Sequence, residues 1–176
     1  MTTFLLICGV VIAAYVFYRR FQRGAHMIGK YIDATAPVRA AAKRIGFQSQ
    51  PNVHSVVSVN SPELCVAAMA HAFAQMDDNQ EPCSETLATS LKKHLNVGDT
   101  QVDDFCTLCP WLVTEGGGPT PAFDRLTKRL KQLDHGPYFS KMMNVLGDVA
   151  ASGTKGMPSP RQADAMGALA RIFRTA

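Results

Sequence analysis

Apolar residues recur at helical spacing through most of the chain after residue 60. Leu64, Ala68 and Ala72 are four residues apart, which would place them on one face of a helix. Leu87 and Leu91 repeat this spacing in the next segment. No stretch long enough for a sheet alternates cleanly between apolar and polar residues. The pattern therefore predicts an all-α domain of about six short helices.

Start and stop signals place these helices along the chain. Several expected helices open with a hydroxyl residue followed by proline, the residue favoured at the first helical position. These starts are Ser61-Pro62, Thr120-Pro121 and Ser159-Pro160. Further helices are expected from Ser84, Asp99 and Pro137. The three glycines at residues 116–118 predict a loop, and Pro110 is expected to kink or split the helix that begins at Asp99.

One helix-loop-helix plan occurs twice in the chain. Residues 69–95 contain an Ala/Met-rich helix, a polar loop with a proline, a serine cap and an amphipathic helix. Residues 142–173 repeat the same plan. Two copies are too few for a solenoid, so the repeat predicts a compact bundle with pseudo-two-fold symmetry.

The first eighteen residues carry no charged side chain and are followed by Arg19, Arg20 and Arg23. An apolar run of this length approaches the roughly 17–25 residues that a membrane-spanning helix needs. A cleaved signal peptide would have its basic residues before the run, and a buried core helix would seldom end in three arginines. We therefore predict that residues 1–23 form a transmembrane anchor, with arginines at the membrane interface and the C-terminal domain in the cytoplasm.

Charge is distributed unevenly along the chain. The net charge is +4, yet residues 19–44 alone hold seven basic residues and one acidic residue. The rest of the chain is mildly acidic, so no nucleic-acid partner is expected. Residues 24–60 are interpreted as a basic juxtamembrane connector, with a turn or an extended piece at residues 53–59. Its Ala-rich stretch at residues 34–45, interrupted by Pro37, is interpreted as a solvated helix to which attraction to anionic lipid is a passive addition. Residues 61–176 form the expected helical domain.

The most specific chemical pattern is the C-x-x-C pair formed by Cys106 and Cys109. Residues three apart share a helix face, so the simplest interpretation is two small apolar side chains in the core, reduced in a cytoplasm where disulfides do not persist. A zinc site or a redox dithiol are the alternatives. Zinc needs two more ligands, and no second tight pair exists among the other candidates. These are Cys65, Cys83, His71 and His94.

Four carboxylates cluster around the loop between the first two domain helices: Asp77, Asp78, Glu81 and Glu85. Carboxylate oxygens are ligands for Ca²⁺ and Mg²⁺, although the series typical of an EF-hand loop is missing. The alternative is a solvated loop in which Glu85 favours a helix N-terminus. No other cofactor is expected.

This repeat resembles the TerB-like domains, which are all-helical and pseudo-two-fold. The family's acidic loop resembles residues 74–79 leading to Glu85, with Asn79 where glycine is usual. In the second half residues 151–153 match in shape, with serine in place of the acid and Arg161 or Gln162 near the glutamate position.

The resemblance covers about residues 61–174 and extends to membrane-anchored DnaJ-like co-chaperones, in which such a domain follows one N-terminal transmembrane helix. The J-domain His-Pro-Asp signature is absent here, so chaperone stimulation is not carried over. The resemblance implies an interaction module tethered to a bacterial inner membrane and linked to envelope or metal stress.

No convergent catalytic constellation is visible in the sequence, so we expect a non-catalytic adaptor that recruits a cytoplasmic protein. Two alternatives remain open. The first is a divalent-metal-responsive domain with Asp78 and Glu85 as ligands, joined by Asp77 and Glu81. The second is a thiol redox protein that uses the C-x-x-C pair.

Overall fold

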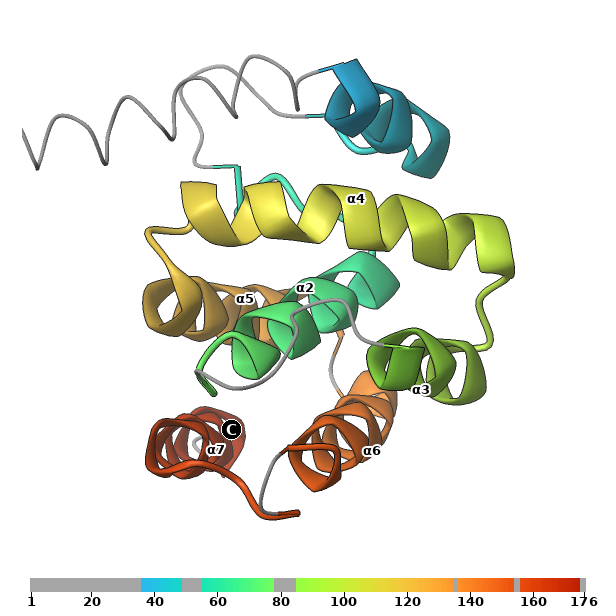
Figure 1. Cartoon of the computed structure of the whole chain (residues 1–176). Helices are drawn as coiled ribbons and strands as arrows, with labels where there is room; N and C mark the ends of the chain where they lie inside the picture. Colours follow the sequence, from blue (N-terminus) through green and yellow to red (C-terminus); the bar gives the residue numbers. More distant parts are fainter. Residues whose placement is uncertain (1–35, 49–54, 78–84, 135, 154–155, 175–176) are drawn as a thin grey trace, which may run out of the picture. The chain divides into compact units, whose positions relative to one another are not determined.

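The computed structural model describes residues 36–48, 55–77, 85–134, 136–153 and 156–174 (Figure 1). Its compact helical unit is Ala40–Ala176, and Met1–Arg39 form a separate unit. The described residues of the compact unit contain helices and no strand, which confirms the all-α class. Residues 36–45 are helical, and the helices that follow are α2 (Pro62–Ala74), α3 (Glu85–Leu95), α4 (Asp99–Glu115), α5 (Pro119–Leu133), α6 (Pro137–Ala151) and α7 (Pro160–Arg174).

Helix α2 lies at the centre of the compact unit and packs against α4, α5 and α6 (Figure 1). Every residue from Leu64 to Ala74 is buried. The sequence pattern placed Leu64, Ala67, Ala68 and Ala72 on one face, whereas burial extends around the whole helix. Alanines make up five of these eleven buried residues, so neighbouring helices can approach α2 closely.

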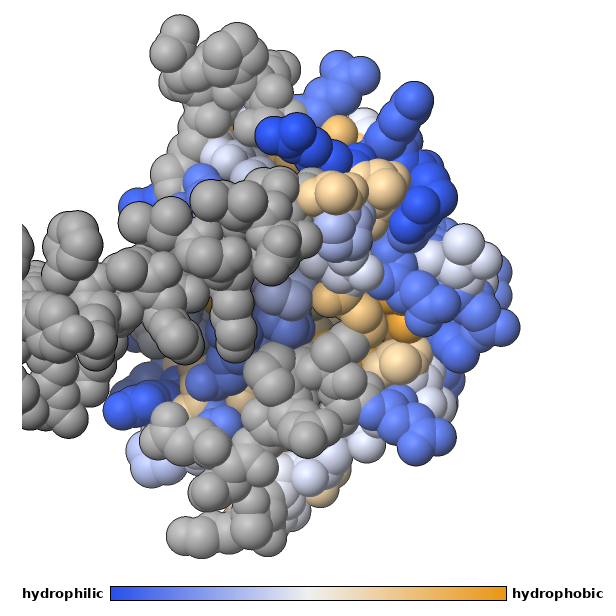
Figure 2. All heavy atoms as spheres, turned by 45° about the horizontal axis from the view of Figure 1, so that its top comes forward, coloured by the Kyte–Doolittle hydropathy of each residue, from blue (hydrophilic) through white to orange (hydrophobic). Residues whose placement is uncertain are grey.

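The surrounding helices are amphipathic, as their spacing predicts. Leu87 and Leu91 of α3 are buried, as are Phe123, Leu126 and Leu130 of α5. Helix α3 packs on α6, whereas α7 packs on α5. On the face shown in Figure 2, hydrophilic residues form most of the described rim, with small apolar areas between them. The apolar stripes thus point inward around α2.

The segment that precedes α2 is packed on the helices. Residues 55–58 form a turn, and Val56 and Val59 are fully buried. Arg129 of α5 donates from Nε to the carbonyl of Val59 at 2.7 Å and from Nη2 to the side chain of Asn60 at 2.9 Å. The compact unit therefore includes residues 40–60, which the charge pattern assigned to the connector.

Helix α4 runs unbroken from Asp99 to Glu115 although Pro110 lies inside it. The expected split does not occur, because Leu108 and Leu112 on either side of the proline are buried in the core. The glycine loop is confirmed. Gly117 and Gly118 have φ of +90° and +103°, which L side chains rarely adopt, and they turn the chain sharply into α5.

Residues 1–23, with the three arginines Arg19, Arg20 and Arg23, lie outside the described residues. Within the described ranges, none of the helices combines the length and the apolar character that crossing a bilayer requires.

Candidate functional site

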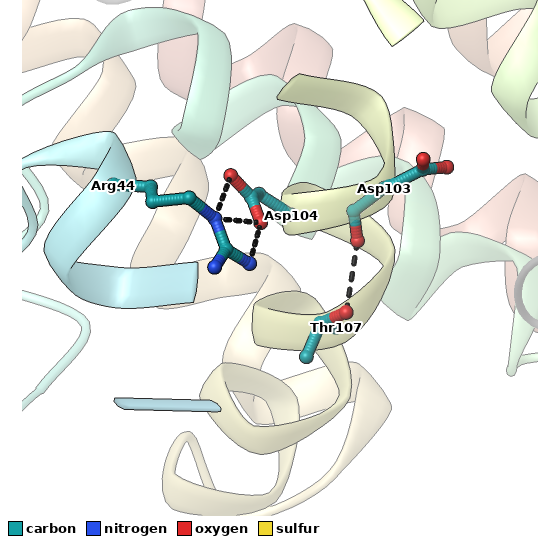
Figure 3. Close-up of polar contacts among 4 residues, drawn as sticks. All are labelled: Arg44, Asp103, Asp104 and Thr107. Atoms are coloured by element: carbon teal, nitrogen blue, oxygen red, sulfur yellow. Dashed lines mark hydrogen bonds and ion pairs between the residues drawn. The ribbon is translucent and has the colours of Figure 1, made fainter. Parts of the chain in front are cut away.

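A bidentate ion pair joins Arg44, near the end of the helical residues 36–45, to Asp104 of α4 (Figure 3). Arg44 donates from Nε to both carboxylate oxygens of Asp104, at 2.9 and 3.0 Å, and from Nη2 to Oδ1 at 2.5 Å. The side chain of Asp104 is 6% exposed and that of Arg44 is 57% exposed. The hydrogen bond to Asp104 raises the pKa of Arg44. A buried carboxylate is thus satisfied by a cation that reaches in from the surface.

The chain reversal after this arginine has a defined geometry. Gly46, at φ +77°, donates to the carbonyl of Lys43 at 3.2 Å, and Phe47 donates to the carbonyl of Ala42 at 2.8 Å. These are the two hydrogen bonds of a Schellman motif, which ends a helix and needs glycine at this position. The motif directs Phe47 onto Trp111 of α4, with the two rings edge to face at 6.1 Å between centroids.

Asp104 and Trp111 are seven residues apart on α4 and therefore share a face, which also contacts Arg44 and Phe47. Ala41 of the same segment is fully buried. We call these five residues the connector-docking site. The backbone of Asp103 accepts a hydrogen bond from Thr107, and its carboxylate points away from Arg44 (Figure 3).

The C-x-x-C pair is divided between two environments. Cys109 is a free, buried thiol, and burial raises its pKa. Cys106 is half-buried and disulfide-bonded. The prediction of a reduced cysteine in the core is therefore right for Cys109. It is wrong for Cys106, which is not a free thiol. The remaining described cysteine, Cys65, is free and buried, and burial raises its pKa to about 12.

A second polar cluster joins α3 to α6. Ser90 donates to Oδ2 of Asp148 at 2.8 Å, and His94 Nε2 lies 2.9 Å from the same oxygen. The hydroxyl of Ser90, with a further contribution from His94, holds the pKa of Asp148 below its ordinary value. Ser90 is buried and bonded to the carboxylate rather than to the imidazole, so it is not paired with a base as a nucleophile would be. Sequence spacing placed His94 near a helix end but did not reveal its partner.

A third cluster joins the start of α2 to the start of α6. The hydroxyls of Tyr138 and Ser61 donate to different oxygens of Glu63, the latter at 2.7 Å. Burial acts to raise the pKa of Glu63, but these hydrogen bonds outweigh it and the pKa is lowered. The same contact with Glu63 raises the pKa of Tyr138 to about 12. This cluster fixes two helix starts against each other.

The acidic loop is only partly described. Asp78 and Glu81 lie outside the described residues, and Glu85 is exposed at the first position of α3. Asp77 approaches the loop after α6: a Cβ built on Gly153 would lie 3.1 Å from its Oδ2. No group of three or more His, Cys, Asp or Glu side chains suited to a metal ion occurs within the described ranges. The metal site at these four carboxylates stays a prediction.

Gln162 has a role that the sequence did not reveal. It forms a capping box with Ser159, donating its backbone N–H to the hydroxyl at 3.3 Å and accepting from the Ser159 N–H at 2.9 Å. Its buried side-chain amide also donates to the carbonyl of Phe73 at 2.9 Å. Gln162 therefore ties the start of α7 to the end of α2. The capping spacing was visible in the sequence, but the long-range partner was not.

These clusters share one structural use, which is to join elements distant in the sequence. The connector-docking site differs from the others because it fixes residues 41–47, near the start of the compact unit, on α4. It is therefore the best candidate for a functional role within the described residues. Comparison of this chain with known protein families, characterised proteins and solved structures yields no match.

Proposed function

We propose that this chain is a non-catalytic adaptor tethered to a bacterial inner membrane, with its N-terminus outside and its helical domain in the cytoplasm. Eighteen uncharged leading residues followed by Arg19, Arg20 and Arg23 support the tether and its orientation. The domain would recruit an unidentified cytoplasmic protein through its exposed helix faces, with a role in the envelope or metal stress response.

The connector-docking site is the observation that carries this proposal. A flexible tether would leave the last connector residues in solvent. Here Ala41 is buried, Arg44 is paired with Asp104, and Phe47 contacts Trp111. Residues 40–47 are thus a fixed part of the domain, so any linker to the membrane anchor would be shorter than the 24–60 span that the charge pattern predicts.

The use of the polar clusters supports a binding role rather than a catalytic one. The carboxylates of Glu63, Asp104 and Asp148 are each engaged by a side chain from another element. These three carboxylates hold helices together, and they are not arranged around a common reaction centre. The proximity of Asp77 to Gly153 supports the proposed TerB-like relationship, because it brings together the two loops that the resemblance pairs.

Alkaline carbonate extraction tests the tether. The full-length chain should remain in the membrane pellet, and a Val11→Arg variant should move to the supernatant because an arginine at the middle of a spanning helix costs about 2.5–3.5 kcal/mol. Val11→Leu is the matched control and should stay in the pellet. Release of the unaltered chain by carbonate would overturn the proposal.

Recruitment is tested by chemical crosslinking in intact cells, followed by purification of the solubilised full-length chain. The proposal expects one cytoplasmic protein in near-stoichiometric amount. That protein should also be captured by an Arg44→Lys variant, in which a cation at position 44 is retained. Recovery of the chain without any stoichiometric partner would contradict an adaptor role.

A divalent-cation-responsive domain is the second candidate function, favoured by the position of Asp77 beside the loop after α6. The proposed ligands are Asp78 and Glu85, joined by Asp77 and Glu81. Calorimetry with Ca²⁺ and Mg²⁺ on the full chain should show binding that is weakened in Asp77→Asn. The matched control is Asp124→Asn on α5. Absence of both heat and a shift in Tm would exclude this function.

A further inference from the structure

Positive charge is concentrated on two helices of the compact unit, α5 and α7. Together these helices hold seven basic residues and two acidic ones, a net charge of +5. The rest of the compact unit, Ala40–Ala176, holds six basic and eleven acidic residues, a net charge of −5. The unit is therefore neutral as a whole but polarised, whereas the two signs are ordinarily interspersed on a protein surface.

The structure brings basic residues of the two helices together at one end. Helix α7 packs on α5, and Lys131 near the end of α5 donates from Nζ to the carbonyl of Ile172 at 2.6 Å. Two arginines flank Ile172 in the last turn of α7. Lys128 lies one turn before Lys131 on the same side of α5. We call Lys128, Lys131, Arg171 and Arg174 the basic α5–α7 face.

Helix-end electrostatics explain only part of this face. The carbonyl end of a helix carries about −0.5 charge and attracts cations, so two helix ends supply about one negative charge against these four positive ones. Lys128 also lies more than one turn before the end of α5, beyond the range of this effect. Lys128 and Arg174 are exposed, and neither forms an ion pair within the part of the chain that the structure describes. The face thus retains positive charge that can attract an anionic partner.

The partner that fits this face best is an acidic segment of another protein. A bilayer or a nucleic acid is an extended polyanion, so it would face acidic surface as well as the basic helices, and the unit as a whole offers it no net attraction. A membrane-binding surface would also insert large apolar side chains. Among the described residues, the large apolar side chains that are exposed are Val57 and Met157, which lie outside α5 and α7. A short acidic segment can instead contact the basic helices alone.

We propose that the basic α5–α7 face is the surface through which this domain recruits its partner, and that the partner presents an acidic segment to it. The inference rests on the adaptor role proposed above and adds the location and the chemistry of the binding surface. The acidic remainder of the unit repels the same segment, which restricts binding to this face. Because exposed charge pairs are individually weak and screened by ions, binding should weaken as salt is added.

Lysine acetylation of the full-length chain in phosphatidylcholine nanodiscs, measured residue by residue by mass spectrometry, tests this surface. The probe is an oligoglutamate peptide. The peptide should slow the acetylation of Lys128, whereas Lys93, an exposed lysine on α3, should react at its original rate. An oligolysine peptide should protect neither residue. Because each lysine is read separately, binding of the peptide to the basic residues 19–44 does not affect the result.

Variants that keep Lys128 as the reporter separate charge from other effects. Arg171→Gln with Arg174→Gln should raise the peptide concentration that half-protects Lys128 by about 5-fold, because two exposed charge contacts are lost. Arg171→Lys with Arg174→Lys retains both charges and should restore protection. The matched control is Lys92→Gln with Lys93→Gln, which removes the same charge from α3 and should leave protection of Lys128 unchanged. The exposed positions of the four residues make loss of folding unlikely to intervene, and equal Tm values check this.

Protection of Lys93 to the same degree as Lys128 would overturn the proposal, because binding would then not be confined to the face. So would slow acetylation of Lys128 in nanodiscs that contain phosphatidylglycerol when no peptide is present, since the bilayer would then occupy the face. In intact cells, the crosslinked partner should be lost from Arg171→Gln with Arg174→Gln and kept by the α3 control. Its retention by both would overturn this inference and leave the adaptor role standing, whereas failure of the adaptor role would appear as the absence of any partner from the unaltered chain.

Discussion

The buried carboxylate of Asp104 holds residues 40–47 on the surface of α4. Its side chain is 6% exposed, and burying a charge is unfavourable unless it is paired and hydrogen-bonded. Arg44 supplies three donor contacts from a segment sixty residues earlier in the chain. The pair therefore favours docking of residues 40–47 on α4, because undocking would leave the Asp104 carboxylate without the cation that satisfies it.

Removal of this cation should loosen the connector while the helical core stays folded. In Arg44→Gln we expect faster hydrogen–deuterium exchange of the backbone amides in residues 40–47, and a red-shifted emission of Trp111 as Phe47 leaves it. Lys43→Gln removes the same charge from an exposed neighbour and should change neither signal. Equal exchange in the two variants would show that the ion pair does not hold the segment.

Asp148 predicts a defined pH dependence. Its pKa in the folded protein lies below the ordinary carboxyl value of 3.8, chiefly because Ser90 donates to it. The stabilisation is therefore complete above about pH 4 and is lost as the pH falls through the folded-state pKa. The effect should be small, because the carboxylate is 39% exposed and solvent screens it.

Thermal unfolding of the unaltered chain and of Asp148→Asn between pH 7 and pH 3 checks this sign. The unaltered chain should have the higher Tm at neutral pH, and the difference should shrink as the pH falls from about 4 towards 3, because the Asp148 carboxylate is progressively protonated there. A difference that grows on acidification would contradict the assignment.

At the scale of elements, the turn from α4 to α5 depends on close approach. A Cβ on Gly116 would lie 2.5 Å from Cβ of Ala122 and 2.9 Å from its Cα, and Ala122 is itself fully buried in α5. The next two glycines adopt positive φ. The turn therefore needs the absence of side chains at residues 116–118, for steric reasons at the first position and conformational reasons at the others.

Two glycine substitutions should have opposite effects. Gly116→Ala should lower the free energy of unfolding by about 1–3 kcal/mol, because the methyl group cannot fit without moving α5. Gly147→Ala, in the exposed middle of α6 with no atom within 4 Å of the added Cβ, should raise it by about 0.5–1 kcal/mol. Urea titration of both variants checks the signs, and a neutral Gly116→Ala would show that the turn can adjust.

At the scale of the whole molecule, α2 makes the compact unit cooperative. It contacts α3, α4, α5 and α6, so few other helices can shift without disturbing it. Its small side chains allow this close contact on every side. A change in the volume of α2 should therefore act on the complete fold rather than on one element.

Ala68→Leu, at a fully buried position of α2, should lower the free energy of unfolding by about 1–3 kcal/mol through overpacking. Ala170→Leu on the exposed face of α7 should change it by no more than about 0.5 kcal/mol. Far-ultraviolet circular dichroism and Trp111 fluorescence should report coincident urea transitions in Ala68→Leu. Separate transitions would show that the helices unfold independently of α2.

The sequence predicted the helices because their signals are local. Proline and hydroxyl residues at helix starts, apolar spacing and the glycine loop each act within a few residues, and α2 to α7 begin within about two residues of the expected positions. It did not predict which apolar helix is buried on all sides. The spacing of apolar residues indicates that a helix has an apolar face. How many helices pack around it depends on the tertiary structure.

The partners of the polar residues were decided by tertiary structure alone. Arg44 and Asp104 are sixty residues apart, and Gln162 and Phe73 are eighty-nine apart. In the sequence these residues look like ordinary surface and capping positions, because nothing local reports a partner on another element. By itself the sequence determined the helical class and the uncharged leading segment, since periodicity and net charge are properties of the chain. The packing of the helices decided the docking of the connector and the separate environments of Cys106 and Cys109, because burial exists only once the helices have come together.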